Sequence, residues 1–422
     1  MARVKQAIFK FQPFSRKQKQ ILTWWLPDSG VSHYDGIIAD GAIRSGKTVS
    51  MSLSFVMWAM ESFNEENFGM CGKTIGSFRR NVLAPLKRML LSRGYKLIDH
   101  RADNLIEIRR KGKTNYFYIF GGKDERSQDL IQGITLAGLL LDEVALMPES
   151  FVNQATGRCS VTGSKFWFNC NPGSPAHWFK SKWIDAASSK NLLYLHFTMD
   201  DNRSLSEPTK ARYRAMYAGV FFRRYILGEW CVAEGVVYPM FDPDKHTAAN
   251  YGTQGMYYIS IDYGTVNPTA MGLWLVQNGT AVMVKEYYYN SRKEGKQKTD
   301  EEYYSDLEEF AGKLPIQRVI VDPSAASFKE CIRRHGKFHV WDAQNAVLDG
   351  IRYTATLLQT GRLLFDGSCT NTFNEFGAYR WDDSNPREDA VIKENDHSMD
   401  QVRYFAMTVM RRILKSGVQR GV

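Results

Sequence analysis

The chain has 422 residues, of which 44% are hydrophobic and 24% charged, a composition that is ordinary for a globular protein with more than one core. No apolar run reaches roughly 20 residues, which argues against a membrane protein. The basic start lacks an apolar leader segment, so we expect no secretion signal. None of the six cysteines forms a C-x-x-C pair, which argues against a zinc or disulfide scaffold. The formal net charge of +10 favours a polyanionic partner, nucleic acid first.

Residues 1–230 alternate short apolar runs with helical stretches. The apolar runs include GIIAD, FGMCGK, LAGLLLD, KFWFNCN and LLYLHFT. Strands that alternate with helices predict an α/β domain with a mainly parallel sheet covered on both faces. The segment 231–252 is rich in Gly, Pro and Asp and has little helical periodicity, so we interpret it as a linker.

The first apolar run leads directly into a glycine-rich loop. Residues 41–48 match the pattern G-x-x-x-x-G-K-[ST] at every fixed position, between an apolar strand and a helical run. In such a loop, backbone N–H groups surround phosphate oxygens, the lysine contacts the β- and γ-phosphates, and the threonine hydroxyl binds Mg²⁺. We therefore expect an ATP-binding site that involves Gly41, Arg44, Ser45, Gly46, Lys47 and Thr48.

Besides the threonine hydroxyl, magnesium is expected to need an acidic ligand at the end of a buried strand, and LAGLLLDE supplies one. Asp142 follows five apolar or small residues and is predicted to hold the Mg²⁺ shell. Glu143 is predicted to activate the attacking water as a general base. Together with the loop, this pair of acids indicates ATP hydrolysis.

Other positions in this half leave alternatives open. Arg44 is either a cis arginine finger that reaches the γ-phosphate or a side chain that faces DNA or solvent. In WFNCNPGS, an amide of Asn169 or Asn171 senses the γ-phosphate, or the segment is only an Asn-Pro-Gly turn. Gln18, in FQPFSRKQKQIL, is a candidate for reading adenine.

Residues 253–422 follow a different α/β order, with three hairpin strands before an alternation of helices and strands. We expect strands at 256–262, 269–276, 280–290, 318–322 and 338–342, and helices at 299–312, 344–360 and 397–414.

Carboxylates end two of these strands and open the last helix. Asp262 ends the first strand and Asp322 the fourth, and a carboxylate at the end of an apolar strand is costly unless it is paired or bound to metal. Asp396 and Asp400 lie four residues apart, so a helix places them on one face. Asp396 is either a ligand or only the helix N-cap.

This order of acids predicts an RNase H-like nuclease. Carboxylate oxygens suit Mg²⁺ or Mn²⁺. Two such ions about 4 Å apart would clamp the attacking and leaving oxygens of a phosphodiester. The candidate metal ligands are Asp262, Asp322, Asp396 and Asp400.

With these motifs in this order, the chain resembles the large terminase subunit of tailed bacteriophages, within the prophage-type group of Gram-positive hosts. The resemblance covers nearly all 422 residues and extends to NCNP, YILGEW, SIDYG, VIVDPS and NDHSMDQVRY. It implies an N-terminal P-loop ATPase domain at 1–230 and a C-terminal RNase H-like nuclease domain at 253–422. Carried over by motif, the ATPase residues are Lys47, Thr48, Asp142 and Glu143, and the nuclease ligands are Asp262, Asp322 and Asp400, with His397 nearby.

The resemblance also implies a function. Such a motor hydrolyses ATP to move double-stranded viral DNA into a procapsid through the portal protein, and its nuclease cuts concatemeric DNA. We expect a small terminase subunit as partner and a homo-oligomeric ring on the portal. We expect the protein in the host cytoplasm, transiently on the procapsid, and not in the mature virion or a membrane.

Two other functions would use some of the same motifs. A cellular helicase-nuclease or DNA-repair ATPase would use the same two chemistries, but the sequence has a single P-loop and no helicase motifs over two lobes. A DNA-binding assembly protein with a degenerate ATPase conflicts with the intact Lys47, Thr48, Asp142 and Glu143.

Overall fold

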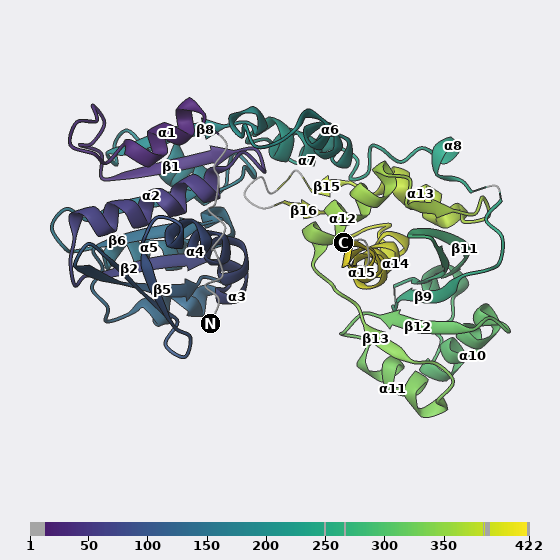
Figure 1. Ribbon diagram of the computed structural model, residues 1–422. Helices are drawn as coiled ribbons and strands as arrows, with labels where there is room; N and C mark the ends of the chain where they lie inside the picture. Colours follow the sequence, from purple (N-terminus) through teal and green to yellow (C-terminus); the bar gives the residue numbers. More distant parts are fainter. Residues whose placement is uncertain (1–12, 249, 266, 383, 385–388, 420–422) are drawn as a thin grey trace, which may run out of the picture. The chain divides into compact units, whose positions relative to one another are not determined.

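The computed structural model describes residues 13–419 except 249, 266, 383 and 385–388, and these residues form two compact units (Figure 1). The first unit contains the described residues up to Ala211 together with Phe222–Val232, and the second contains Arg212–Phe221 and the described residues from Ala233 onward. Of the basic start at residues 1–19, where we expect no secretion signal, residues 1–12 lie outside the described part. None of the helices in the described part has the length and apolar character of a membrane span.

The first unit is built on an eight-stranded sheet with the order β3-β4-β5-β2-β6-β7-β1-β8. From β5 to β8 in this order all neighbours run parallel, whereas β3 and β4, and β4 and β5, pair antiparallel. The predicted mainly parallel sheet is confirmed. The strands are β1 (Gly36–Gly41), β2 (Asn67–Gly72), β3 (Lys96–His100), β4 (Leu105–Arg110), β5 (Lys113–Gly121), β6 (Gly138–Asp142), β7 (Lys165–Asn169) and β8 (Leu192–Phe197).

Adjacent residues of β7 show that both faces of this sheet are covered. Successive side chains of a strand point to opposite faces. Trp167 packs on one face against Phe55, with ring centroids 5.2 Å apart, and Phe168 packs on the other against Trp183, at 4.8 Å. The first face is covered by α1 (Arg16–Thr23), α2 (Lys47–Ser62) and α4 (Ala84–Leu91), and the second by α5 (Glu149–Gly157).

The second unit is built on a six-stranded sheet with the order β13-β12-β9-β10-β11-β14. β9, β10 and β11 are antiparallel neighbours, and β12 and β13 continue the sheet parallel to β9. The three hairpin strands predicted to open this domain are confirmed. The strands are β9 (Met256–Asp262), β10 (Thr269–Gln277), β11 (Thr280–Tyr289), β12 (Ile316–Val321), β13 (Val340–Asp342) and β14 (Leu363–Phe365), of which β14 was not expected.

Helices pack on both faces of this second sheet as well. Ile259 and Ile261 of β9 join the core formed with α10 (Asp300–Ala311) and α11 (Ala326–His335). Ser260 points the other way, and its hydroxyl donates to the Gln401 side chain of α14 (His397–Phe405) at 2.6 Å. The remaining long helices are α12 (Val347–Gln359), α13 (Thr370–Ala378) and α15 (Arg411–Gln419), which a π-helical turn (Ala406–Met410) joins to α14.

The segment 231–252, interpreted as a linker, contributes packed side chains to the second unit. Tyr238 is 2% exposed, and its ring stacks on Tyr379 with centroids 6.1 Å apart. A short helix, α8 (Pro243–His246), follows. The second unit also takes in 212–221, which precedes the expected domain limit at residue 230. A lack of helical periodicity indicates irregular backbone, but it does not exclude burial.

Candidate functional site

The chain turns sharply between β1 and α2, and glycine is required at both ends of the turn. Gly41 has a φ of +120°, and a Cβ there would lie 2.0 Å from the carbonyl oxygen of Phe197. Gly46 has a φ of +86° and is the N-cap of α2. Glycine adopts such backbone conformations without a steric penalty. The helix therefore begins at Lys47, with its positive end at the loop.

Lys47 is held inside this loop by acceptors of the first unit. Its side chain is almost fully buried, and Nζ donates to the carbonyl oxygens of Gly41 at 3.0 Å and Ala42 at 2.7 Å, and to Asn171 Oδ1 at 3.2 Å. Burial lowers the pKa of Lys47 to about 8, whereas the nearby Asp40 carboxylate acts to raise it. An ammonium group fixed at this point is placed to meet the phosphates of a nucleotide.

Thr48 and Asp142 meet at the carboxyl end of the parallel strands. The Thr48 hydroxyl donates to Asp142 Oδ1 at 3.0 Å, and the Asn169 amide donates to Thr48 Oγ1 at 2.9 Å and also to Asp142. The register of β6 and β7 pairs Asp142 with Asn169, which explains this contact. Burial raises the pKa of Asp142 to about 6. Hydroxyl and carboxylate oxygens are ligands that Mg²⁺ prefers, so the pair fits the predicted ion.

Two residues near the loop have a left-handed backbone. Glu143 has a φ of +59° and caps a short 3-10 turn, and Arg44 has a φ of +57°. The Arg44 side chain is exposed, and its carbonyl oxygen accepts the Asn202 amide at 2.6 Å. Such conformations are uncommon for residues with a side chain and concentrate at functional sites.

The amide residues of the prediction occupy different places. Asn169 contacts Thr48 and Asn171 contacts Lys47, so both lie at the loop. Gln18 caps α1, where its Oε1 accepts the backbone N–H of Ser15 at 2.9 Å. Its Nε2 lies against Gly46. The expected contact of Gln18 with adenine stays a prediction.

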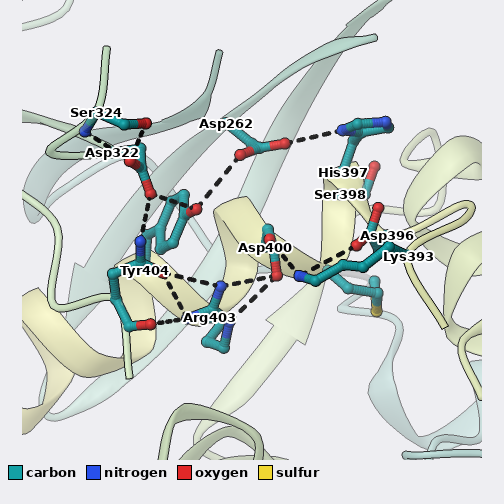
Figure 2. A network of polar contacts seen from close by, with 12 residues as sticks. Asp262, Asp322, Ser324, Lys393, Asp396, His397, Ser398, Asp400, Arg403 and Tyr404 are labelled. Atoms are coloured by element: carbon teal, nitrogen blue, oxygen red, sulfur yellow. Dashed lines mark hydrogen bonds and ion pairs between the residues drawn. The ribbon is translucent and has the colours of Figure 1, made fainter. Parts of the chain in front are cut away.

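In the second unit, acids gather around a pocket of about 500 Å³ at the end of β9 and the start of α14. Figure 2 shows Asp262, Asp396 and Asp400 there, with His397 and Lys393. His397 Nδ1 lies 2.9 Å from Asp262 Oδ2, and Lys393 Nζ lies 3.5 Å from Asp396 and 3.7 Å from Asp400. Three carboxylates facing one pocket form an oxygen set that suits Mg²⁺ or Mn²⁺.

The geometry bears on the two alternatives for Asp396. It occupies the N-cap position of α14, but its side chain makes no capping hydrogen bond, and it lines the pocket. Burial raises the pKa of Asp262, and the Asp400 and Asp396 charges act in the same direction, although the hydrogen bond from His397 opposes them. A divalent cation bound between these carboxylates would relieve their electrostatic repulsion.

Asp322 lies behind this pocket and does not line it. Its Oδ1 accepts the backbone N–H of Ser324 at 2.7 Å and the Ser324 hydroxyl at 2.5 Å, and its Oδ2 accepts Tyr404 and the Asn345 amide, each at 2.7 Å (Figure 2). Burial acts to raise the pKa of Asp322, but these hydrogen bonds hold it below its usual value. Tyr404 also reaches Asp262 Oδ1 at 3.4 Å. To bind a metal as predicted, Asp322 would have to exchange at least one of these hydrogen bonds for the metal ion.

Sequence reasoning missed Arg403, which supports the acids from behind. Its side chain is 1% exposed and donates to Asp400 Oδ1 through two nitrogens, at 2.8 and 3.2 Å. A third nitrogen donates to the Asn345 carbonyl at 3.0 Å. Gly350 of α12 makes room for it, because a Cβ there would lie 2.4 Å from Arg403 Cγ. The available signal was the i, i+3 spacing from Asp400 to Arg403 on one helix.

Comparison with known proteins places the chain in a family. Residues 38–243 match the family described as terminase large subunit, T4likevirus-type, N-terminal. The large terminase subunit of Escherichia phage T5 is 22% identical over 294 residues, which cover 65% of this chain and 65% of that protein, slightly less than two thirds of its length.

A solved structure of the large terminase from a thermophilic bacteriophage is 59% identical to this chain, with a TM-score of 0.90, and the match covers 94% of this chain and all of that one. This chain belongs to the phage large terminase family. The predicted family is thereby confirmed. A second structure of the same bacteriophage protein, in complex with ATP-γ-S, is 57% identical, with a TM-score of 0.86 and coverage of 94% and 100%.

The ion pair of Arg403 and Asp400 gives a prediction about stability. Arg403→Met leaves the Asp400 carboxylate without its buried partner, and we expect the free energy of unfolding to fall by about 3–5 kcal/mol. Equilibrium urea unfolding of the full chain measures this change. Arg334→Met, which removes an exposed arginine paired with Glu330, should change it by less than about 0.5 kcal/mol. Equal effects of the two substitutions would contradict the structural role of Arg403.

Proposed function

We propose that this chain is a viral DNA-packaging motor, in which ATP hydrolysis drives double-stranded DNA into a procapsid and a metal-dependent endonuclease cuts concatemeric DNA to start and end packaging. The observation that carries the proposal is the combination, in one chain of the large terminase family, of a buried loop lysine beside the Thr48–Asp142 hydrogen bond in the first unit and a carboxylate-lined pocket in the second.

In the ATPase, Lys47 and the backbone N–H groups of the loop bind the β- and γ-phosphates. Thr48 and Asp142 would hold Mg²⁺, which would supply positive charge against the transferred phosphoryl group. Glu143 takes the proton of the attacking water as a general base. Arg44 is the candidate cis finger. Asn171, which accepts a hydrogen bond from Lys47, is the candidate sensor of the γ-phosphate, and Gln18, beside the loop, is the adenine candidate.

In the nuclease, Asp262, Asp396 and Asp400 would hold the metal from the pocket, and Asp322 would add a ligand only if part of its hydrogen bonding were exchanged. When bound, Mg²⁺ or Mn²⁺ would supply positive charge that stabilises the attacking and leaving oxygens of the phosphodiester. His397 orients Asp262, and Arg403 orients Asp400, and both carboxylates line the pocket. Both positions depend on buried hydrogen bonds, as for ligands in other metal sites.

The partners follow from the same proposal. The net charge of +10 suits double-stranded viral DNA. The chain works as a homo-oligomeric ring on the portal protein, with a small terminase subunit that selects the packaging site. It acts in the host cell cytoplasm, transiently on the procapsid, and is absent from the mature virion.

Glu143→Gln separates ATP hydrolysis from DNA cleavage. It removes the base but keeps the size of the side chain, so we expect kcat for ATP to fall roughly 100-fold or more. Nucleotide affinity and metal-dependent DNA cleavage should be retained. Phosphate release and plasmid cleavage assays measure the two activities. Glu149→Gln, an acid of the following helix that pairs with Lys182, is the matched control. Undiminished turnover in Glu143→Gln would reject the assignment of the base.

Asp262→Asn separates the activities in the opposite direction. Loss of a carboxylate charge at the pocket should lower DNA cleavage with Mg²⁺ or Mn²⁺ at least roughly 100-fold, while ATP turnover is unchanged. Asp306→Asn serves as control, since this acid is bonded to Tyr287 and Lys298 at 2.5 Å each, and it does not line the pocket. A fully active Asp262→Asn nuclease would exclude the proposed metal site.

Translocation distinguishes a packaging motor from a helicase-nuclease. We expect purified procapsids that carry the portal, together with this chain, ATP and linear double-stranded DNA, to protect the DNA from added nuclease. Protection should disappear with Lys47→Ala, which removes the phosphate contact. The absence of protection with the unaltered chain, combined with ATP-dependent strand separation, would favour the helicase-nuclease.

A further inference from the structure

Asp40 is a buried charged residue that the roles proposed above do not use. It stands in β1 directly before Gly41 and is 0% exposed. A carboxylate removed from water is costly unless its oxygens are hydrogen-bonded. Its Oδ2 accepts the indole N–H of Trp230 at 2.6 Å, and its Oδ1 lies 3.0 Å from His196 Nδ1. Both oxygens are therefore engaged by aromatic ring nitrogens, and the Tyr194 side chain also hydrogen-bonds to Asp40.

The segment 225–230, which carries the indole, also touches the backbone of the P-loop. The N–H of Ile43 donates to the carbonyl of Tyr225 at 2.9 Å. Gly228 has a φ of +79°, and a Cβ there would lie 3.0 Å from the Ala42 nitrogen. On the other side, the Ala42 N–H donates at 2.8 Å to the last carbonyl of β8. The start of the P-loop is thus held between β8 and the segment 225–230.

This arrangement joins parts of the chain that are far apart in sequence. Asp40 and Trp230 are 190 positions apart, and Trp230 stands two residues before Val232, where the first unit ends and the chain continues into the second. A negative charge beside an anion-binding loop opposes phosphate binding through simple electrostatics. The same charge acts to raise the pKa of Lys47, so the hydrogen bonds of Asp40 have to be tested separately from its charge.

We propose that Asp40 is a positioning residue for ATP hydrolysis, which acts through the Trp230 indole to fix the P-loop against the segment 225–230. The inference rests on the ATPase function proposed above. A phosphate group must be held in reacting geometry for turnover, and small displacements of the groups around it lower the rate more than they weaken binding. The same hydrogen bond makes the P-loop geometry depend on the last segment of the first unit.

Substitutions at Asp40 separate hydrogen bonding from charge. An asparagine keeps an acceptor for Trp230 and offers its amide N–H to His196, whose Nδ1 accepts in the other tautomer. Asp40→Asn thus loses the charge but retains the contacts, whereas Asp40→Ala loses both. Trp230→Phe keeps an aromatic ring and removes only the indole donor.

Steady-state ATP hydrolysis by the full chain tests the proposal. Trp230→Phe and Asp40→Ala should each lower kcat roughly tenfold or more, while KM for MgATP changes less than about threefold. Asp40→Asn should stay within about threefold of the unaltered chain in both constants. The double variant Asp40→Ala/Trp230→Phe should be no slower than Asp40→Ala, because both changes remove one shared contact.

A matched control comes from another buried indole bond of the first unit. Trp167 Nε1 donates to Ser54 Oγ at 3.2 Å, and Ser54→Ala removes that acceptor without touching the P-loop contacts described here. It should lower the thermal midpoint while leaving kcat and KM unchanged. All variants are assayed well below their own midpoints, so that a loss of folded protein does not appear as a loss of rate.

The outcomes separate this inference from the proposed function. Unchanged kcat in Trp230→Phe, or additive losses in the double variant, would overturn the positioning role while ATP hydrolysis by the unaltered chain stands. A loss in Asp40→Asn as large as that in Asp40→Ala would also overturn it, since charge would then be the cause. No ATP hydrolysis by the unaltered chain would overturn the proposed ATPase and, with it, this inference.

Discussion

Lys47, Asp142, Asp322 and Arg403 are charged side chains that lie almost wholly out of water, each at the end of a strand or on a helix packed against a sheet. A charge in such a place destabilises the fold by several kcal/mol unless neighbouring groups hydrogen-bond to it. The backbone carbonyls around Lys47 and the amide of Asn169 beside Asp142 meet this requirement in the first unit. The glycines of the turn and the register of β6 and β7 bring the hydrogen-bonding groups to Lys47 and Asp142.

The second unit meets the same requirement with two kinds of acid. Asp322 accepts four hydrogen bonds from protein groups and has its pKa held low, so it is a fixed negative charge behind the pocket. Asp262 and Asp400 line the pocket, and His397 and Arg403 each hydrogen-bond to one of these two carboxylates. Tyr404 joins the two kinds, because its hydroxyl reaches both Asp262 and Asp322.

Rigid support of this sort fits the chemistry proposed for each unit. Phosphoryl transfer and phosphodiester cleavage depend on charges placed before the substrate arrives, since reorganisation during the reaction raises the barrier. Asp40 extends the principle to the P-loop itself, whose entry is fixed by contacts with β8 and with the segment 225–230.

Sequence alone determined the parts of this protein whose chemistry lies in consecutive residues or in a regular period. The P-loop works through the backbone of residues 41–48, and an acid after an apolar run, as at Asp142 and Asp262, indicates a strand end, so these predictions needed no tertiary contact. The mainly parallel first sheet and the three hairpin strands that open the second followed from the same periodicity.

Tertiary structure alone decided which distant groups share a hydrogen bond. No periodic pattern in the sequence indicates that Asp40 bonds to Trp230, or that Asp322 bonds to Asn345 and Tyr404, because packing and not spacing along the chain brings these partners together. The burial of Tyr238, in the segment interpreted as a linker, has no such pattern either. The packing of α14 on β9 likewise places the Asp396 side chain at the pocket, where it makes no capping hydrogen bond.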